Sequence, residues 1–91
     1  MLNYYLKKVI MKKRMIYEFI CAFVDERTDG WITDIKHNDN LVDDLGFDSI
    51  DLADLKIRLE KKFSIYIENG AVYEWKTVKD VVEDVYHLAN Y

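Results

Sequence analysis

A single serine among aspartates is the feature of this chain with the clearest chemical potential. Five aspartates occupy the positions from 43 to 54, and Ser49 lies among them. Asp48 is a good N-cap residue, so Ser49 is predicted to stand in the first turn of a helix with its hydroxyl exposed. A phosphate ester on that hydroxyl would lie at the positive end of the helix. The aspartates would oppose such an anion, which indicates that they dock a basic partner protein instead.

Hydrolase chemistry at the same serine is poorly supported. A nucleophile elbow needs a glycine where Asp51 stands, and it needs a strand before the serine. His37 and His87 are the only candidate bases, and nothing in the sequence brings either of them near Ser49.

Metal and disulfide sites are also poorly supported. The single Cys21 excludes an internal disulfide and a cysteine-based zinc site, and we expect it to pack as a small apolar side chain. The two histidines have no partner at metal-ligand spacing. Residues 25–36 resemble a calcium loop only faintly, because Lys36 stands where a bidentate glutamate is needed. We therefore expect no metal.

The spacing of apolar residues predicts the helices that position Ser49. A helical stripe predicts either one long helix over about residues 3–26 or a short helix followed by a main one. A second helix is expected from the Asp48 cap to about Lys62, a single turn over 71–75, and a last helix opened by a capping arrangement at Thr77. A long loop over 27–46 precedes the second helix, and its apolar residues are expected to anchor it: Trp31, Ile32, Ile35, Leu41, Val42 and Leu45.

These elements predict an all-α fold, a small four-helix bundle with three long helices, one short helix and a long first loop. The length of 91 residues leaves room for a single core. We assign residues 1–12 to an N-terminal extension, expected to be helical, and residues 13–91 to the domain.

Charge is unevenly distributed along the chain. Residues 1–20 carry five basic side chains against Glu18, whereas residues 21–91 carry eight basic and sixteen acidic side chains. The acidic body favours a protein with a basic patch as partner and disfavours nucleic acid. The basic start is interpreted as a solvated helix face. The longest apolar run, from Phe19 to Val24, is too short to span a membrane, so we expect a cytoplasmic protein. We also expect a monomer.

The segment from Asp44 to Leu52, Asp-Leu-Gly-Phe-Asp-Ser-Ile-Asp-Leu, resembles the signature of the acyl carrier protein family. The resemblance covers roughly residues 15–91. It implies that Ser49 receives 4′-phosphopantetheine from coenzyme A, donated by a phosphopantetheinyl transferase. It also implies a carrier rather than an enzyme, which delivers thioesters to acyl-transferring, condensing or ligating enzymes of fatty-acid or related, polyketide-like biosynthesis.

The resemblance further implies roles for side chains around the serine. Those that match partner-docking positions are Asp48, Ile50, Asp51, Asp54 and Ile57. Those that match the lining of an acyl-binding cleft are Leu55, Leu59, Ile67, Val72 and Trp75. The bulk of Trp75 leads us to expect a shortened cleft.

The chain departs from the family pattern after Asp54, where the second helix becomes basic. Cognate partners are therefore expected to present a mixed patch or to touch only the first turns. Two alternatives stay open: an aminoacyl or peptidyl carrier of a nonribosomal pathway, and an unmodified helical adaptor that docks through its acidic face.

Overall fold

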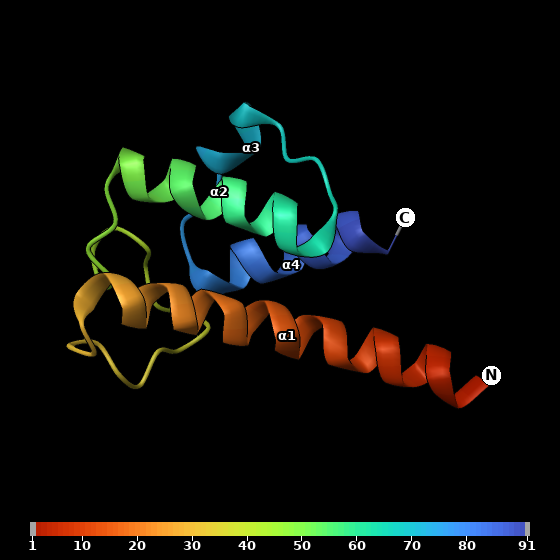
Figure 1. Ribbon diagram of the computed structural model, residues 1–91. Helices are drawn as coiled ribbons and strands as arrows, with labels where there is room; N and C mark the ends of the chain where they lie inside the picture. The colour runs from red at the N-terminus through yellow and green to blue at the C-terminus, as the bar shows by residue number, and fades with distance from the viewer. Residues whose placement is uncertain (1, 91) are drawn as a thin grey trace.

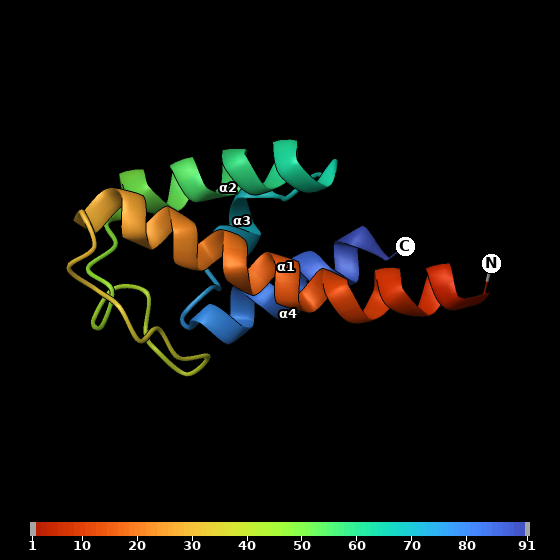
Figure 2. The same ribbon diagram turned by 60° about the horizontal axis from the view of Figure 1, so that its bottom comes forward.

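Four helices make up the regular structure of this computed structural model, which describes the backbone of residues 2–90 and the side chains of residues 13–90. In chain order they are α1 (Leu2–Thr28), α2 (Ser49–Phe63), α3 (Asn69–Val72) and α4 (Val78–Ala89). Helix α1 runs opposite to α2 and α4, and the short α3 lies beside α2 (Figures 1 and 2). The predicted all-α bundle, with three long helices, one short helix and a long first loop, is confirmed.

The core forms where the long helices meet each other and the loop. Helix α1 is continuous, so the single-helix alternative is correct. Burying apolar side chains from every helix stabilises the bundle, because each removes hydrocarbon surface from water. The buried apolar residues among those described are Ile16, Ile20, Phe23 and Val24 of α1, Leu55 and Leu59 of α2, Val72 of α3, Val78, Val81, Val82 and Val85 of α4, and Ile35, Leu41, Leu45, Phe47, Ile67 and Trp75 of the connections.

Part of the expected N-terminal extension lies outside the described side chains. The backbone of α1 covers residues 2–12, but the apolar stripe of Leu2, Tyr5, Leu6, Val9 and Ile10 belongs to side chains that the structure does not describe. The division between residues 1–12 and 13–91 therefore stays a prediction. No helix within residues 2–90 is long and apolar enough to cross a membrane.

Backbone hydrogen bonds hold the long loop against the start of α4. The Leu41 N–H donates to the carbonyl of Lys76 at 2.8 Å. In return, the Lys79 N–H donates to the carbonyl of His37 at 2.8 Å, and the Val78 N–H donates to that of Asp39 at 3.1 Å. The loop thus satisfies helix-end N–H groups that have no partner within α4.

The loop anchors are only partly those predicted. Ile35, Leu41 and Leu45 are buried and Ile32 packs against the core, as expected. Trp31 and Val42 are instead 88% and 54% exposed, so the prediction was wrong for them. Trp31 follows the left-handed turn that ends α1, and Val42 faces outward where the Asn40 side chain closes a tight turn.

Helix α3 begins earlier than predicted. It covers Asn69–Val72 rather than residues 71–75. As a result Trp75 follows the helix instead of closing it.

Candidate carrier site at the start of helix α2

Ser49 is the first residue of α2 and is exposed. Its position is fixed by a reciprocal pair of hydrogen bonds on either side of it. The Asp51 N–H donates to Asp48 Oδ1 at 2.8 Å, and the Asp48 N–H donates to Asp51 Oδ2 at 2.9 Å. The predicted cap is therefore confirmed and is a complete capping box, which satisfies two otherwise unpaired N–H groups.

The chain before the cap is also held in place. Gly46 has a φ of +71°, a left-handed conformation that glycine adopts without strain. The Gly46 N–H donates to the carbonyl of Val42 at 3.0 Å, and the Phe47 N–H donates to that of Leu41 at 2.9 Å. Phe47 itself is buried, so the segment that leads to Ser49 is anchored in the core.

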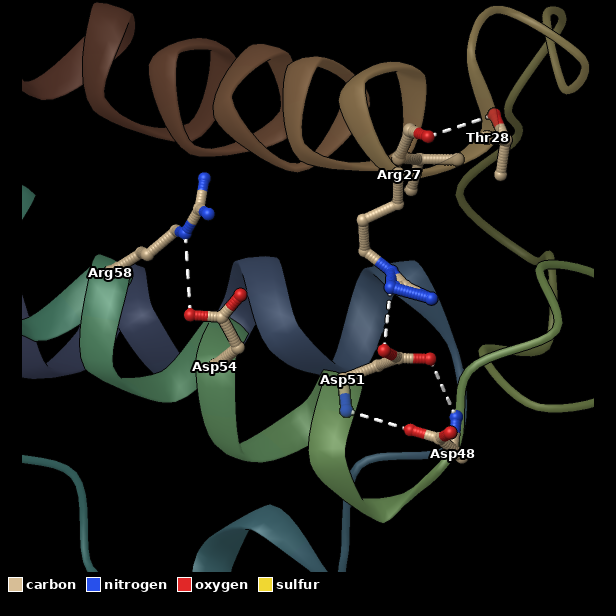
Figure 3. Close-up of polar contacts among 7 residues, drawn as sticks. Arg27, Thr28, Asp48, Asp51, Asp54 and Arg58 are labelled. Atoms are coloured by element: carbon tan, nitrogen blue, oxygen red, sulfur yellow. Dashed lines mark hydrogen bonds and ion pairs between the residues drawn. The ribbon is translucent and has the colours of Figure 1, made fainter.

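Asp51 is tied to helix α1 as well as to the cap. Arg27, near the end of α1, makes an ion pair with Asp51 Oδ1, while the other carboxylate oxygen accepts from Asp48 (Figure 3). Asp51 is only 7% exposed, and its charge is matched by the guanidinium. The structure thus makes Asp51 a positioning residue for the serine turn, and its burial argues against the docking contact implied by the resemblance.

The capping geometry sets the charge beside the serine. The backbone hydrogen bond from Asp51 is the main cause that lowers the pKa of Asp48 below its usual range, and the nearby Arg27 acts in the same direction. Asp48 is exposed, so a negative charge stands next to Ser49 at neutral pH.

A groove of about 440 Å³ opens beside the serine, between α2 and α3. We call it the Ser49 groove. Its walls are mainly apolar, and the polar side chains of Asp48, Ser49, Lys56 and Asn69 also line it. The residues that line it are Val42, Phe47, Asp48, Ser49, Leu52, Ala53, Lys56, Asn69, Val72 and Tyr73.

Lys56 is held at the wall of the Ser49 groove by a carboxylate. Its ammonium lies 3.3 Å from Glu60 Oε1, and its side chain is only 16% exposed. Glu60 Oε2 accepts from the Ile67 N–H at 2.8 Å, and this bond is the main cause that lowers the pKa of Glu60. A charged pair therefore links α2 to the segment that leads into α3.

Of the five side chains expected to line an acyl cleft, Val72 alone is among the residues that line the Ser49 groove. Leu55, Leu59 and Ile67 are fully buried in the core behind it. Trp75 points toward α4, where its indole N–H donates to Asp84 Oδ2 at 3.0 Å. The expectation that Trp75 shortens this cleft is therefore not supported by its position.

The remaining docking residues lie along the outer face of α2. Ile50 is 75% exposed and Ile57 is 48% exposed, so both present apolar surface to the solvent. Asp54 Oδ1 lies 3.3 Å from Arg58 Nε, and Arg58 Nη1 lies 3.1 Å from Glu26 Oε2 on α1. Figure 3 shows Asp54 and Arg58 beside the Arg27 contact.

The other candidate residues lie in surroundings that suit packing. The ring of His37 stacks on Tyr17 with centroids 4.5 Å apart, at the junction of the loop with α1. Burial raises the pKa of the half-buried Cys21 thiol, which packs against the core as expected. No cluster of metal-ligating side chains occurs in the part of the chain that the structure describes.

Sequence reasoning missed Arg27 and Arg58 as partners of the aspartates. Each belongs to an ion pair between α1 and α2, and contacts between separate helices leave no local pattern. The one available signal was the short acidic stretch of α2 facing a helix that ends in arginine.

Comparison with known proteins bears on this site. The family model for the phosphopantetheine attachment site matches residues 30–85, which include the whole cap and the groove. The chain is 35% identical over 78 residues to the acyl carrier protein of Phytoplasma mali, across 85% of this chain and 93% of that protein. It is 38% identical over 66 residues to the acyl carrier protein of Helicobacter hepaticus, across 72% of this chain and 87% of that protein.

The fold has a solved counterpart. The crystal structure of the acyl carrier protein of Thermotoga maritima matches with a TM-score of 0.76. The match covers 88% of this chain and 93% of that one at 24% identity, which supports the shared arrangement of helices.

Proposed function

The chain belongs to the acyl carrier protein family, and from that membership we propose that Ser49 is the residue to which 4′-phosphopantetheine is attached. Members of this family are carriers rather than enzymes, and they hold the group covalently. When bound, the group supplies a terminal thiol that holds acyl chains as thioesters. The observation that carries the proposal is the exposed Ser49, fixed at the start of α2 by the capping box.

The bond-forming step of the attachment requires an accessible hydroxyl from this chain. The Ser49 oxygen forms a bond to phosphorus of coenzyme A, the pyrophosphate bond breaks, and the nucleotide half leaves. The hydroxyl proton passes to a base of the phosphopantetheinyl transferase. Asp48 and Asp51 keep the turn rigid, because each carboxylate is engaged with a backbone N–H of the other.

The surroundings of Ser49 fit an amphipathic arm. The Ser49 groove is large enough to shelter part of such an arm or a short acyl chain, with apolar contacts from Leu52 and Val72. Lys56 and Asn69 offer hydrogen-bond donors to carbonyl oxygens along it. These features support the groove as the resting place of the arm.

We further propose which residues dock partner enzymes, and in which pathway and compartment the protein acts. Asp48, Ile50, Asp54 and Ile57 present a charged and apolar surface to the transferase and to acyl-transferring, condensing or ligating enzymes. The pathway proposed is fatty-acid or related biosynthesis in the cytoplasm. Exposed apolar residues next to acidic ones are typical of a surface that binds its partners transiently.

The proposal is tested by intact mass after incubation with coenzyme A and a promiscuous phosphopantetheinyl transferase. Wild type is expected to gain one adduct, and Ser49→Ala is expected to gain none. Ser64→Ala is a matched control, because Ser64 is the other serine of the chain and lies at the opposite end of α2. A wild type that gains no adduct would instead support an unmodified adaptor, and an adduct on Ser49→Ala would show that another residue is modified.

A further inference from the structure

The outer face of α2 changes its charge from one end to the other. Successive residues of a helix are separated by about 100°, so positions 50, 54, 57 and 61 lie within about 60° of one another around the axis. We call Ile50, Asp54, Ile57 and Lys61 the α2 ridge. All four belong to the surface of the helix turned away from its buried side chains, Leu55 and Leu59.

The carboxylate of the α2 ridge is engaged in an ion pair within the protein. Asp54 is paired with Arg58, which also contacts Glu26, and the three groups form one chain of ion pairs. Asp51, one turn earlier, is buried against Arg27. Asp48, beside Ser49, differs from Asp51 and Asp54 in this respect. It is exposed, and it makes no ion pair with the described residues.

The far end of the α2 ridge is positive. Lys61 is exposed, and none of the ion pairs among the described side chains involves it. Lys62 is likewise exposed and unpaired there, but it lies about 100° further around the helix. Asp48 lies outside the ridge, at the N-cap beside Ser49. A partner that rests on Ile50 and Ile57 and also reaches Ser49 therefore meets Asp48 at one end and Lys61 at the other.

We propose that the α2 ridge selects partner enzymes whose docking site places a cation near Ser49 and a carboxylate opposite Lys61. The two groups are separated by the distance along α2 from Ser49 to Lys61, twelve residue steps or about 18 Å. An entirely cationic docking site would be repelled at Lys61, since like charges opposed across an interface disfavour binding. This inference rests on the proposed function, because it concerns enzymes that approach Ser49.

The test compares Lys61→Glu with Lys62→Glu. Both substitutions reverse one charge in the last turn of α2, so both disturb the helix dipole alike. They differ in whether the residue belongs to the α2 ridge. The measured quantity is the dissociation constant of the unmodified chain for the phosphopantetheinyl transferase encoded in the same genome, by titration calorimetry at low salt without coenzyme A.

We expect Lys61→Glu to raise the dissociation constant about tenfold, and Lys62→Glu to change it less than about twofold. The difference should disappear near 1 M salt, where the screening length is about 3 Å. Circular dichroism must show the same helix content in both variants. A Lys61→Glu protein that is folded and binds as well as wild type, or better, overturns the inference.

Equal weakening by the two variants also overturns it, because the position on the ridge would then be irrelevant. The proposed function is judged separately by modification of the wild type at Ser49. If wild type is modified while Lys61→Glu binds normally, only the inference about the α2 ridge is contradicted. If wild type is not modified, the proposed function and the inference are both contradicted.

Discussion

Arg27 of α1 pairs with Asp51 of α2 directly beneath the turn that exposes Ser49. One carboxylate oxygen of Asp51 receives the guanidinium and the other receives the Asp48 N–H. Arg27 also lies over the rings of Phe23 and Phe47, at 5.9 and 5.7 Å from their centroids. The position of Ser49 is thus fixed by a contact between two helices as well as by the local cap.

Removing the guanidinium is expected to destabilise the fold. In Arg27→Met the buried carboxylate of Asp51 loses its ion-pair partner, which should lower the free energy of unfolding by about 1–2 kcal/mol. The estimate is below that for a fully buried pair because the Arg27 side chain is 31% exposed. Urea unfolding measures the change.

Two further variants identify its cause. Arg14→Met removes a guanidinium whose side chain is 79% exposed, so its free energy of unfolding should change by less than about 0.5 kcal/mol. Adding Asp51→Asn to Arg27→Met should recover part of the loss. If Arg14→Met is as costly as Arg27→Met, the ion pair is not what stabilises the turn.

The cap residue is expected to matter for stability and modification together. Asp48→Ala removes the acceptor of the Asp51 N–H, so the first turn of α2 should fray and transfer to Ser49 should slow. Asp48→Asn retains a side-chain oxygen at the cap and should preserve the helix. Amide hydrogen exchange at Asp51 and Leu52 reports the fraying, and unchanged exchange in Asp48→Ala would contradict this assignment.

Three carboxylates predict how stability depends on pH. Hydrogen bonds from backbone N–H groups lower the pKa of Asp48, Asp80 and Glu60 in the folded protein. Each contributes stability above its unfolded pKa, and that stability is lost as the pH falls through the lower folded value. The midpoint of thermal unfolding should therefore fall steadily below about pH 5.

Asp80→Asn isolates one of these contributions. Because asparagine does not titrate in this range, the variant should show a shallower loss of stability between about pH 5 and pH 3 than wild type. Calorimetry over that range measures the slope. An identical slope in the two proteins would mean that Asp80 does not contribute.

Acyl cargo is expected to perturb the Ser49 groove rather than the deep core. Leu59 and Ile67 are fully buried and closely packed, whereas Leu52 and Val72 line the open groove. NMR spectra of chains loaded with a short and a long acyl group should thus differ from the unloaded form mainly at groove methyl groups. Large shifts of Leu59 and Ile67 with the long chain would show that the core opens to admit it.

The sequence alone was enough to predict the starts of α2 and α4. Capping boxes are local, so Asp48 with Asp51 and Thr77 with Asp80 could be found by spacing. Contacts between distant segments could not be found in this way. The burial of Asp51 depends on Arg27, which lies on another helix.

The residues that line the cleft beside Ser49 also depend on contacts between distant segments. Spacing placed Trp75 in the turn of α3, but that helix ends at Val72 and the indole turns toward Asp84. Val42 was expected inside and instead lines the Ser49 groove from the loop. Both outcomes depend on where α3 and the loop settle against α2, which apolar periodicity does not determine.

The most direct test of the account is to locate the modification along the chain. Wild-type protein incubated with coenzyme A and transferase should be digested, and the peptides should be fragmented in a mass spectrometer. We predict a single phosphopantetheine, on the Ser49 hydroxyl, with unmodified Ser64. Modification at any other residue, or none on a folded chain with an active transferase, would contradict the central claim.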